Sequence, residues 1–192
     1  PMPNTGTASS ALHRAARAVR AVCARYDFAA FVEFTQRDES TGQPVHLSAV
    51  HREWERRLAT HDRLQILAHV ESGKSNFVSV AWVLFQLGCN PNLRVCLISN
   101  TAAQAEKLLR SIARQIERNA ALHAVFPHLR ASTPWNVNAI TVERSALSKN
   151  PSVFACGLHG ALLGGDDAGA AAQAARRTGA ETESPPHQVL RC

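Results

Sequence analysis

Apolar residues recur along this chain at two spacings, and the spacing predicts which segments are helices and which are strands. Intervals of three and four residues predict amphipathic helices around residues 12–23, 47–58 and 101–116. Short apolar runs instead predict strands, one beginning at Leu64 and others at Arg94–Ser99, Ile140–Arg144 and Ser152–Cys156. Strands that alternate with helices are typical of an α/β fold.

The middle of the chain has the order strand, loop, helix, strand. Ser75–Leu87 is almost wholly apolar, which predicts a buried helix, and Gly88 follows it where a glycine C-cap is common. Arg94–Ser99 then has the continuous apolar character of a buried parallel strand. We therefore expect a βαβ unit with the loop Ala68–Ser75 between its first strand and its helix.

This loop carries the chemistry of a phosphate-binding site. It reads Ala68-His69-Val70-Glu71-Ser72-Gly73-Lys74-Ser75. In a phosphate-binding loop the backbone N–H groups surround the phosphates of ATP, a lysine contacts the β- and γ-phosphates, and a serine hydroxyl joins the Mg²⁺ shell. Lys74 and Ser75 have these two roles here. The dipole of the following helix favours an anion at the same place.

One position departs from the usual pattern. Ala68 stands where phosphate-binding loops carry their first glycine, which is used for its backbone freedom. An ordinary strand–turn–helix with an accidental lysine is therefore the alternative. Asn100 and Thr101 follow the second strand at the edge where α/β proteins place ligand contacts. They are candidates for coupling nucleotide to motion, or simply for capping the next helix.

The helix predicted from Thr101 has one apolar and one basic face. Thr101 and Gln104 match a capping box, and the apolar positions include Ala105, Ile112 and Ile116. Four cations lie on the other side, namely Lys107, Arg110, Arg114 and Arg118. Such a face either follows a nucleic-acid backbone or is the solvated side of the helix.

Composition restricts the class of protein. The chain has 192 residues, enough for one α/β domain, and a formal net charge of +6, which favours acidic partners such as nucleic acid. Its five cysteines form no Cys-x-x-Cys pair, which is typical of free thiols in a reducing compartment. No apolar run reaches membrane-spanning length, so we expect a protein without membrane contact.

The order of motifs resembles the ATPase domain of the large terminase subunit of tailed bacteriophages and prophages, the motor that packages DNA. The resemblance covers about residues 28 to 163. The matching segments are His51–Trp54, the deviant loop Ala68–Ser75, Leu87–Arg94, Ile98–Thr101, Val125–Pro127, Trp135, Ile140–Arg144 and Pro151–Gly157. The loop is the most specific of these, because the family tolerates a missing first glycine.

The resemblance implies a fold and a function. The fold is a P-loop NTPase of the ASCE-like type, a three-layer α/β/α sandwich with a mostly parallel sheet, incomplete at the C-terminus. The function is ATP binding with Mg²⁺ at Ala68–Ser75, in a family that hydrolyses ATP to drive double-stranded DNA into the capsid. The family's partners are the small terminase subunit and the capsid portal, its intact members act as homo-oligomers, and its location is the bacterial host cytoplasm.

The resemblance also implies features that the sequence lacks. A family member continues past Gly164 with an apolar strand ending in paired acids and then a nuclease domain. Here Asp166 and Asp167 have no such strand before them. We therefore expect three parts: a basic N-terminal helix at 1–27, a partial ATPase domain at 28–163 and a low-complexity, disordered tail at 164–192.

We interpret the chain as a truncated or frameshifted terminase ATPase that binds nucleotide and turns it over weakly or not at all by itself. Two alternatives stay open. One is another P-loop nucleotide hydrolase of the helicase-like kind. The other is a non-catalytic module that binds nucleic acid.

Overall fold

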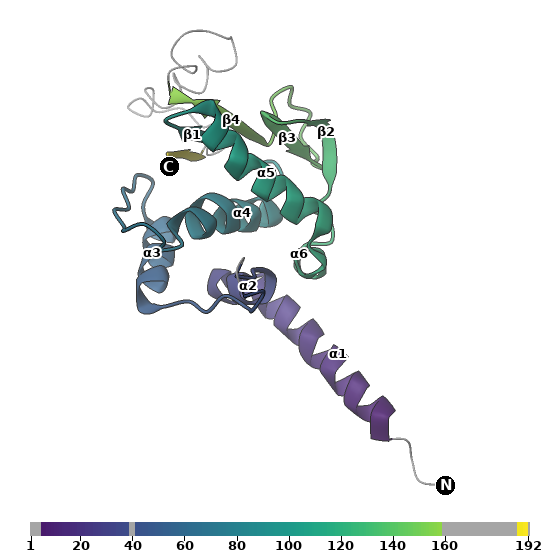
Figure 1. Cartoon of the computed structure of the whole chain (residues 1–192). Helices are drawn as coiled ribbons and strands as arrows, with labels where there is room; N and C mark the ends of the chain where they lie inside the picture. The colour runs from purple at the N-terminus through teal and green to yellow at the C-terminus, as the bar shows by residue number, and fades with distance from the viewer. Residues whose placement is uncertain (1–4, 39–40, 159–187, 192) are drawn as a thin grey trace. The chain divides into compact units, whose positions relative to one another are not determined.

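A computed structural model of the chain describes residues 5–38, 41–158 and 188–191 (Figure 1). The helices are α1 (Thr5–Ala24), α2 (Phe28–Thr35), α3 (Ala49–Thr60), the π-helix η1 (Ser75–Trp82), α4 (Val83–Cys89), α5 (Ala102–Arg118) and α6 (Ala120–Val125). The strands are β1 (Val95–Ser99), β2 (Ala131–Trp135), β3 (Ala139–Val142), β4 (Val153–Gly157) and β5 (Gln188–Arg191).

The chain divides into two compact units. Residues 1–67 and 120–127 form one, which we call the helical unit, and residues 68–119 and 128–192 form the other, which we call the sheet unit. The candidate phosphate loop Ala68–Ser75 and every strand named above belong to the sheet unit. The predicted boundaries at residues 27 and 163 stay predictions.

The helical unit is held together by packing among α1, α2 and α6. Phe31 of α2 is fully buried, and its ring lies 5.8 Å from that of Phe126. Arg25 Nε donates to the Val125 carbonyl oxygen at 2.9 Å, which joins the end of α1 to α6. The predicted basic helix near the N-terminus is confirmed as α1, which has no acidic residue.

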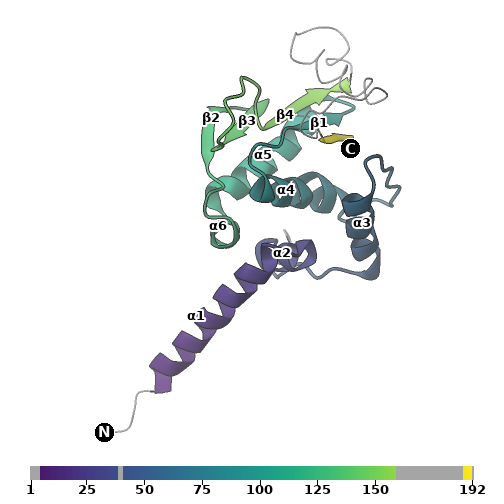
Figure 2. The ribbon, with the colours of Figure 1, turned by 180° about the vertical axis from the view of Figure 1, so that it is seen from behind.

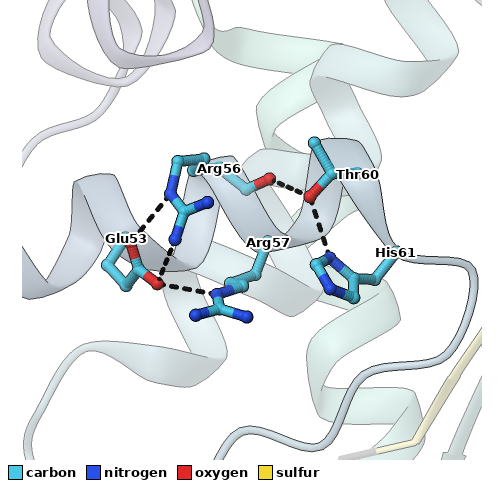
Figure 3. Close-up of polar contacts among 5 residues, drawn as sticks. All are labelled: Glu53, Arg56, Arg57, Thr60 and His61. Atoms are coloured by element: carbon cyan, nitrogen blue, oxygen red, sulfur yellow. Dashed lines mark hydrogen bonds and ion pairs between the residues drawn. The ribbon is translucent and has the colours of Figure 1, made fainter.

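Helix α3 buries one large side chain and carries polar contacts along its exposed surface. Trp54 is buried, while the Glu53 carboxylate accepts hydrogen bonds from Arg56 and Arg57 (Figure 3). These two hydrogen bonds lower the pKa of Glu53 to about 2. His51 Nδ1 accepts from the Ser48 backbone N–H, so this side chain takes part in the cap at the helix start.

The sheet has five strands in the order β2–β3–β4–β1–β5. Strand β1 pairs in parallel with both β4 and β5, whereas β2–β3 and β3–β4 are antiparallel. The prediction of an α/β fold is confirmed. The prediction of a mostly parallel sheet is wrong, because Ala131–Trp135 and Ala139–Val142 form an antiparallel hairpin on the edge of the parallel part.

Helix α5 packs across β1 and β4 and also contacts η1 (Figures 1 and 2). Its buried residues are Ala105, Leu109, Ile112 and Ile116, as the sequence predicts. A Cβ atom added to Gly157 would lie 2.7 Å from the Ala102 backbone N, so β4 meets the start of α5 at backbone distance. Gly157 pairs with Ser99 and alternate residues share a face, so Leu97 and Ala155 also face α5.

The strand predicted to begin at Leu64 does not form, and residues 64–69 have no regular structure. Both edges of β1 are paired, by β4 and by β5, so the segment has no place beside the next strand of the chain. Without a neighbouring strand its backbone groups gain no ladder hydrogen bonds. The segment therefore enters the loop without the strand that a phosphate-binding loop normally follows.

Two further expectations at the ends of elements need correction. The helix after the loop does not end at Gly88: it continues to Cys89, and Asn90 is its C-cap in an extended conformation. Of the predicted disordered tail, Gln188–Arg191 forms strand β5, so the prediction is wrong for these four residues. Asp166 and Asp167 lie outside the described residues.

Within the described ranges, no helix combines the length and the apolar character that a membrane crossing requires. The longest, α1, has 20 residues but carries several arginines.

The close approach at Gly157 gives a first prediction. Gly157→Ala forces a methyl group against the Ala102 backbone, so we expect the free energy of unfolding to fall by about 2–3 kcal/mol. Denaturant unfolding measures it. The control is Gly42→Ala, whose Cβ meets nothing within 4 Å and which suffers only the strain of φ 68°, about 1 kcal/mol. Equal losses in the two variants would contradict the close approach.

Candidate functional site

The candidate phosphate loop has an unusual backbone. Glu71 has φ 66° and Gly73 has φ 75°, so two left-handed residues flank Ser72. For glycine this conformation is free of strain, but for glutamate it is uncommon and costs energy. Alternation of right- and left-handed residues turns successive N–H groups toward one side of the chain, which is how backbone concavities for anions are built.

Hydrogen bonds fix this loop to the helix that follows. The Ser72 N–H donates to the His69 carbonyl oxygen at 3.4 Å, and the Phe77 N–H donates to the Gly73 carbonyl oxygen at 2.9 Å. His69 also places its Nδ1 2.6 Å from the Val70 carbonyl oxygen, a contact in which the ring N–H donates. The first N–H groups of a helix have no partner within it, so the loop ends in a set of backbone donors.

Lys74 and Ser75 lie where the sequence predicts them, at the first turn of the helix. Lys74 has right-handed helical angles and is half-buried, and Ser75 is exposed as the first residue of η1. Behind them Phe77, Val80 and Trp82 are buried, so the helix is anchored in the core of the sheet unit. A lysine and a hydroxyl at the start of an anchored helix can bind an anion and its metal ion.

Three other residues of the loop have solvent-exposed side chains. His69, Val70 and Glu71 are exposed, and Val70 has 88% of its surface in contact with solvent. Ala68, at the place of the missing glycine, is half-buried. The loop is therefore open toward solvent on the side of residues 69–71.

Asn100 and Thr101 follow β1 as predicted, but their roles differ. The Thr101 hydroxyl accepts a hydrogen bond from the Gln104 N–H at 3.3 Å, which makes Thr101 the N-cap of α5. The Gln104 side chain does not complete the capping box, because its Oε1 accepts from Ser99 Oγ at 2.9 Å. Asn100 is exposed beside this cap. Capping thus accounts for Thr101, and a coupling role for either residue stays a prediction.

Among the described residues, no group of three or more histidine, cysteine, aspartate and glutamate side chains is placed to hold a metal ion. A Mg²⁺ ion in a phosphate-binding loop does not need such a group, because the nucleotide and a serine hydroxyl supply part of its shell. The fit of Mg²⁺ here depends on Ser75, whose exposed position at the helix start is compatible with that role.

Sequence reasoning missed two features of the sheet unit. One is Gly157, whose lack of a side chain allows the start of α5 to approach β4; a glycine ending an apolar run was the available signal. The other is the pair Cys96 and Cys156, whose sulfur atoms lie 3.8 Å apart. The two cysteines are 60 residues apart in the sequence, and their contact depends on the strand order, so no sequence pattern predicts it.

Comparison of the chain with models of known protein families finds no match, and a search among curated proteins finds none either.

The left-handed residues of the loop give a second prediction. Glu71→Gly removes the strain of a glutamate at φ 66°, so we expect the free energy of unfolding to rise by roughly 0.5 kcal/mol. In the matched variant Ser72→Gly no such strain is relieved, and the added chain entropy lowers stability by roughly 0.5–1 kcal/mol. Denaturant unfolding measures both changes in the free energy of unfolding and shows whether they have opposite signs. Destabilisation by both variants would show that Glu71 is not left-handed in solution.

Proposed function

We propose that this chain binds ATP with Mg²⁺ through Ala68–Ser75, as part of the ATPase domain of a phage-type large terminase subunit. The observation that carries the proposal is the loop itself. A Gly-Lys-Ser sequence stands at the start of a buried helix, and Glu71 and Gly73 before it are left-handed. Lys74 neutralises the β- and γ-phosphates, and the Ser75 hydroxyl contributes to the Mg²⁺ shell.

The proposed fold is a P-loop NTPase sandwich of three α/β/α layers. In its support, β1 is a buried parallel strand, and it is followed by α5 on one face of the sheet. The antiparallel hairpin of β2 and β3 and the irregular segment directly before the loop are the departures from that fold. The terminase assignment rests on the order of the sequence motifs.

Catalysis is proposed to be weak in this chain. Hydrolysis needs a carboxylate that orients the attacking water, in addition to the groups that bind phosphate. None of the five described strands contains aspartate or glutamate. Glu71 is exposed in the loop, and its negative charge there would repel a triphosphate.

Nucleotide binding gives a third prediction. Isothermal titration calorimetry with ATP and Mg²⁺ measures the affinity, and Lys74→Ala is expected to weaken it roughly ten- to hundredfold because a charge-assisted hydrogen bond is removed. Lys149→Ala is the matched control, since Lys149 is an exposed lysine of the same unit. It removes the same charge and is expected to leave the affinity unchanged.

Two results would contradict the proposal. One is the absence of ATP binding by wild-type protein whose circular dichroism shows it to be folded. The other is an equal loss of ATP affinity in Lys74→Ala and Lys149→Ala. Equal losses would mean that the net charge of the protein, and not the position of Lys74, determines the affinity. Ser75→Ala adds a further readout, because it should weaken ATP binding only when Mg²⁺ is present.

A second candidate function is nucleic-acid binding through α5. Lys107, Arg110, Arg114 and Arg118 are all exposed on the side of the helix away from its buried stripe. From the first to the last, these four cations extend about 16 Å along the helix axis. Glu106 pairs with Arg110 at 3.7 Å, and the Glu117 carboxylate accepts from Trp135 Nε1 at 2.7 Å. The packing of α5 on the sheet holds these cations in one row.

The row of cations gives a fourth prediction, for binding of double-stranded DNA measured by fluorescence anisotropy at several salt concentrations. Replacing all four cations with glutamine should reduce the slope of log affinity against log salt by up to about 3.6, or about 0.9 for each phosphate that is no longer neutralised. A control variant replaces Arg14, Arg17, Arg52 and Lys149 instead, which are exposed elsewhere. An equal change in both variants would show that net charge, not the α5 row, binds DNA.

A further inference from the structure

Helix α1 exposes large apolar side chains that nothing in the proposed function uses. Leu12, Val19 and Val22 have 71%, 63% and 54% of their surfaces in contact with solvent. Tyr26, just past the end of the helix, has 81% of its surface exposed. Single exposed apolar residues are ordinary on a protein surface, but a contiguous group of them marks an interaction surface.

These side chains lie on the side of α1 that faces away from its packing contacts. An α-helix turns by about 100° per residue, so Val19 and Val22 lie about 20° and 80° from Leu12 in one direction. Ala21 lies half a turn from Leu12, and it is buried together with Ala24 where α1 contacts α2 and α6 (Figure 1). We call the exposed group of Leu12, Val19 and Val22 the apolar stripe.

The rest of the circumference of α1 is basic. Arg20, Arg17 and Arg14 lie about 80°, 140° and 200° from Leu12 in the other direction, and the helix has no acidic residue. All three arginines are exposed. The helix is therefore amphipathic, and its charge is complementary to an anionic partner.

A second copy of this chain is a poor partner for the apolar stripe. From Leu12 to Val22 the stripe is about 15 Å long, so a pair of copies would bury roughly a few hundred Å². Specific protein interfaces bury about 1,200 Å² or more. No ion pair between the two copies of α1 would compensate, because the helix has no acidic residue.

An acidic helix of a partner protein fits no better. Paired helices place their charged residues directly beside the apolar seam, where ion pairs form across it. In α1 the stripe is bordered by Ala11 and Ala18 on one side and by Ala16 and Cys23 on the other. Acidic residues beside a partner's seam would therefore find no cation opposite them.

An anionic lipid surface suits both sides of the helix. An amphipathic helix in the plane of a bilayer buries its apolar side about 5–10 Å into the boundary between headgroups and acyl chains. Its arginines extend their long side chains to the headgroup phosphates, and a tyrosine such as Tyr26 is a residue type enriched at this boundary. We propose that α1 binds in the plane of a membrane that contains anionic lipids, with the apolar stripe inward.

This contact requires no membrane-spanning segment. The expectation of a protein without membrane contact rests on the lack of a spanning run, and a helix in the membrane plane needs none. Binding removes the apolar stripe from water, and the arginines add an attraction that salt screens. The affinity for lipid should therefore depend on both the stripe and the ionic strength.

The test is co-sedimentation of the full chain with lipid vesicles at low salt. Vesicles of phosphatidylcholine and phosphatidylglycerol in equal parts are compared with vesicles of phosphatidylcholine alone. We expect binding to the anionic vesicles that is at least roughly tenfold tighter than binding to the neutral ones. Raising the salt concentration to about 1 M, where the Debye length is about 3 Å, should remove most of this difference.

One pair of variants tests the apolar stripe. Leu12→Gln with Val19→Gln should weaken binding to the anionic vesicles roughly tenfold or more, because two side chains no longer leave water favourably. Ser10→Gln with His13→Gln is the matched control on the polar side of α1, and it should leave binding unchanged. All four positions are exposed, and circular dichroism confirms that each variant keeps the helical content of the wild type.

A second pair tests the charge. Arg14→Gln with Arg17→Gln should weaken binding to the anionic vesicles roughly 25-fold, or about fivefold for each arginine near the surface. The control Arg52→Gln with Lys149→Gln removes the same charge at exposed positions outside α1. This control should retain the affinity of the wild type.

Three results would overturn the proposal. The first is a folded wild-type chain that does not sediment with anionic vesicles, and the second is equal binding to neutral ones. The third is a dimer, seen by size exclusion with light scattering, that the Leu12 and Val19 variant abolishes and its control retains. That result would assign the apolar stripe to a second copy of the chain.

Discussion

The sheet unit depends on how closely the backbone of α5 approaches β4. At Gly157 the strand meets the Ala102 N–H region with no side chain between them, and this approach determines where α5 begins. Thr101 then caps the helix and Ser99 donates a hydrogen bond to Gln104, so two hydrogen bonds tie the segment after β1 to the first turn of α5. The row of cations on α5 and the packing of η1 both follow from that placement.

The candidate site obtains its shape from its own backbone more than from the sheet. A phosphate-binding loop usually follows a buried strand, which fixes where it begins. Here residues 64–69 are irregular, and two left-handed residues with the helix η1 define the loop instead. A glutamate in one of those left-handed positions is a local strain, of the kind that is often found where a protein binds a ligand.

The sequence predicts those structural features that depend on residues close together in the chain. Thr101 as a helix cap, Ile112 as a core position of α5 and Val95–Ser99 as a buried strand all follow from spacing within one element. The strand expected from Leu64 failed because pairing depends on which edges of β1 are free, and β5 arrives from residues 188–191. The antiparallel hairpin and the contact of Cys96 with Cys156 likewise depend on strand order, which no local pattern encodes. The site follows the same division: Lys74 and Ser75 were predictable from the motif, whereas the conformation of Glu71 was not.

The π-helical form of η1 has a consequence for the direction of the loop. A π-helix closes its hydrogen bonds between residues i and i+5, so Ser75–Trp82 holds an extra residue compared with an α-helix of the same rise. One residue of an α-helix corresponds to a rotation of about 100°. If η1 returned to α-helical bonding while Trp82 and α4 kept their positions, the residues before the extra one, Lys74 and Phe77 included, would turn by about that angle about the helix axis. The direction of the lysine is therefore set by one extra residue within the helix, and insertion or deletion of a residue within η1 would redirect it without touching the loop.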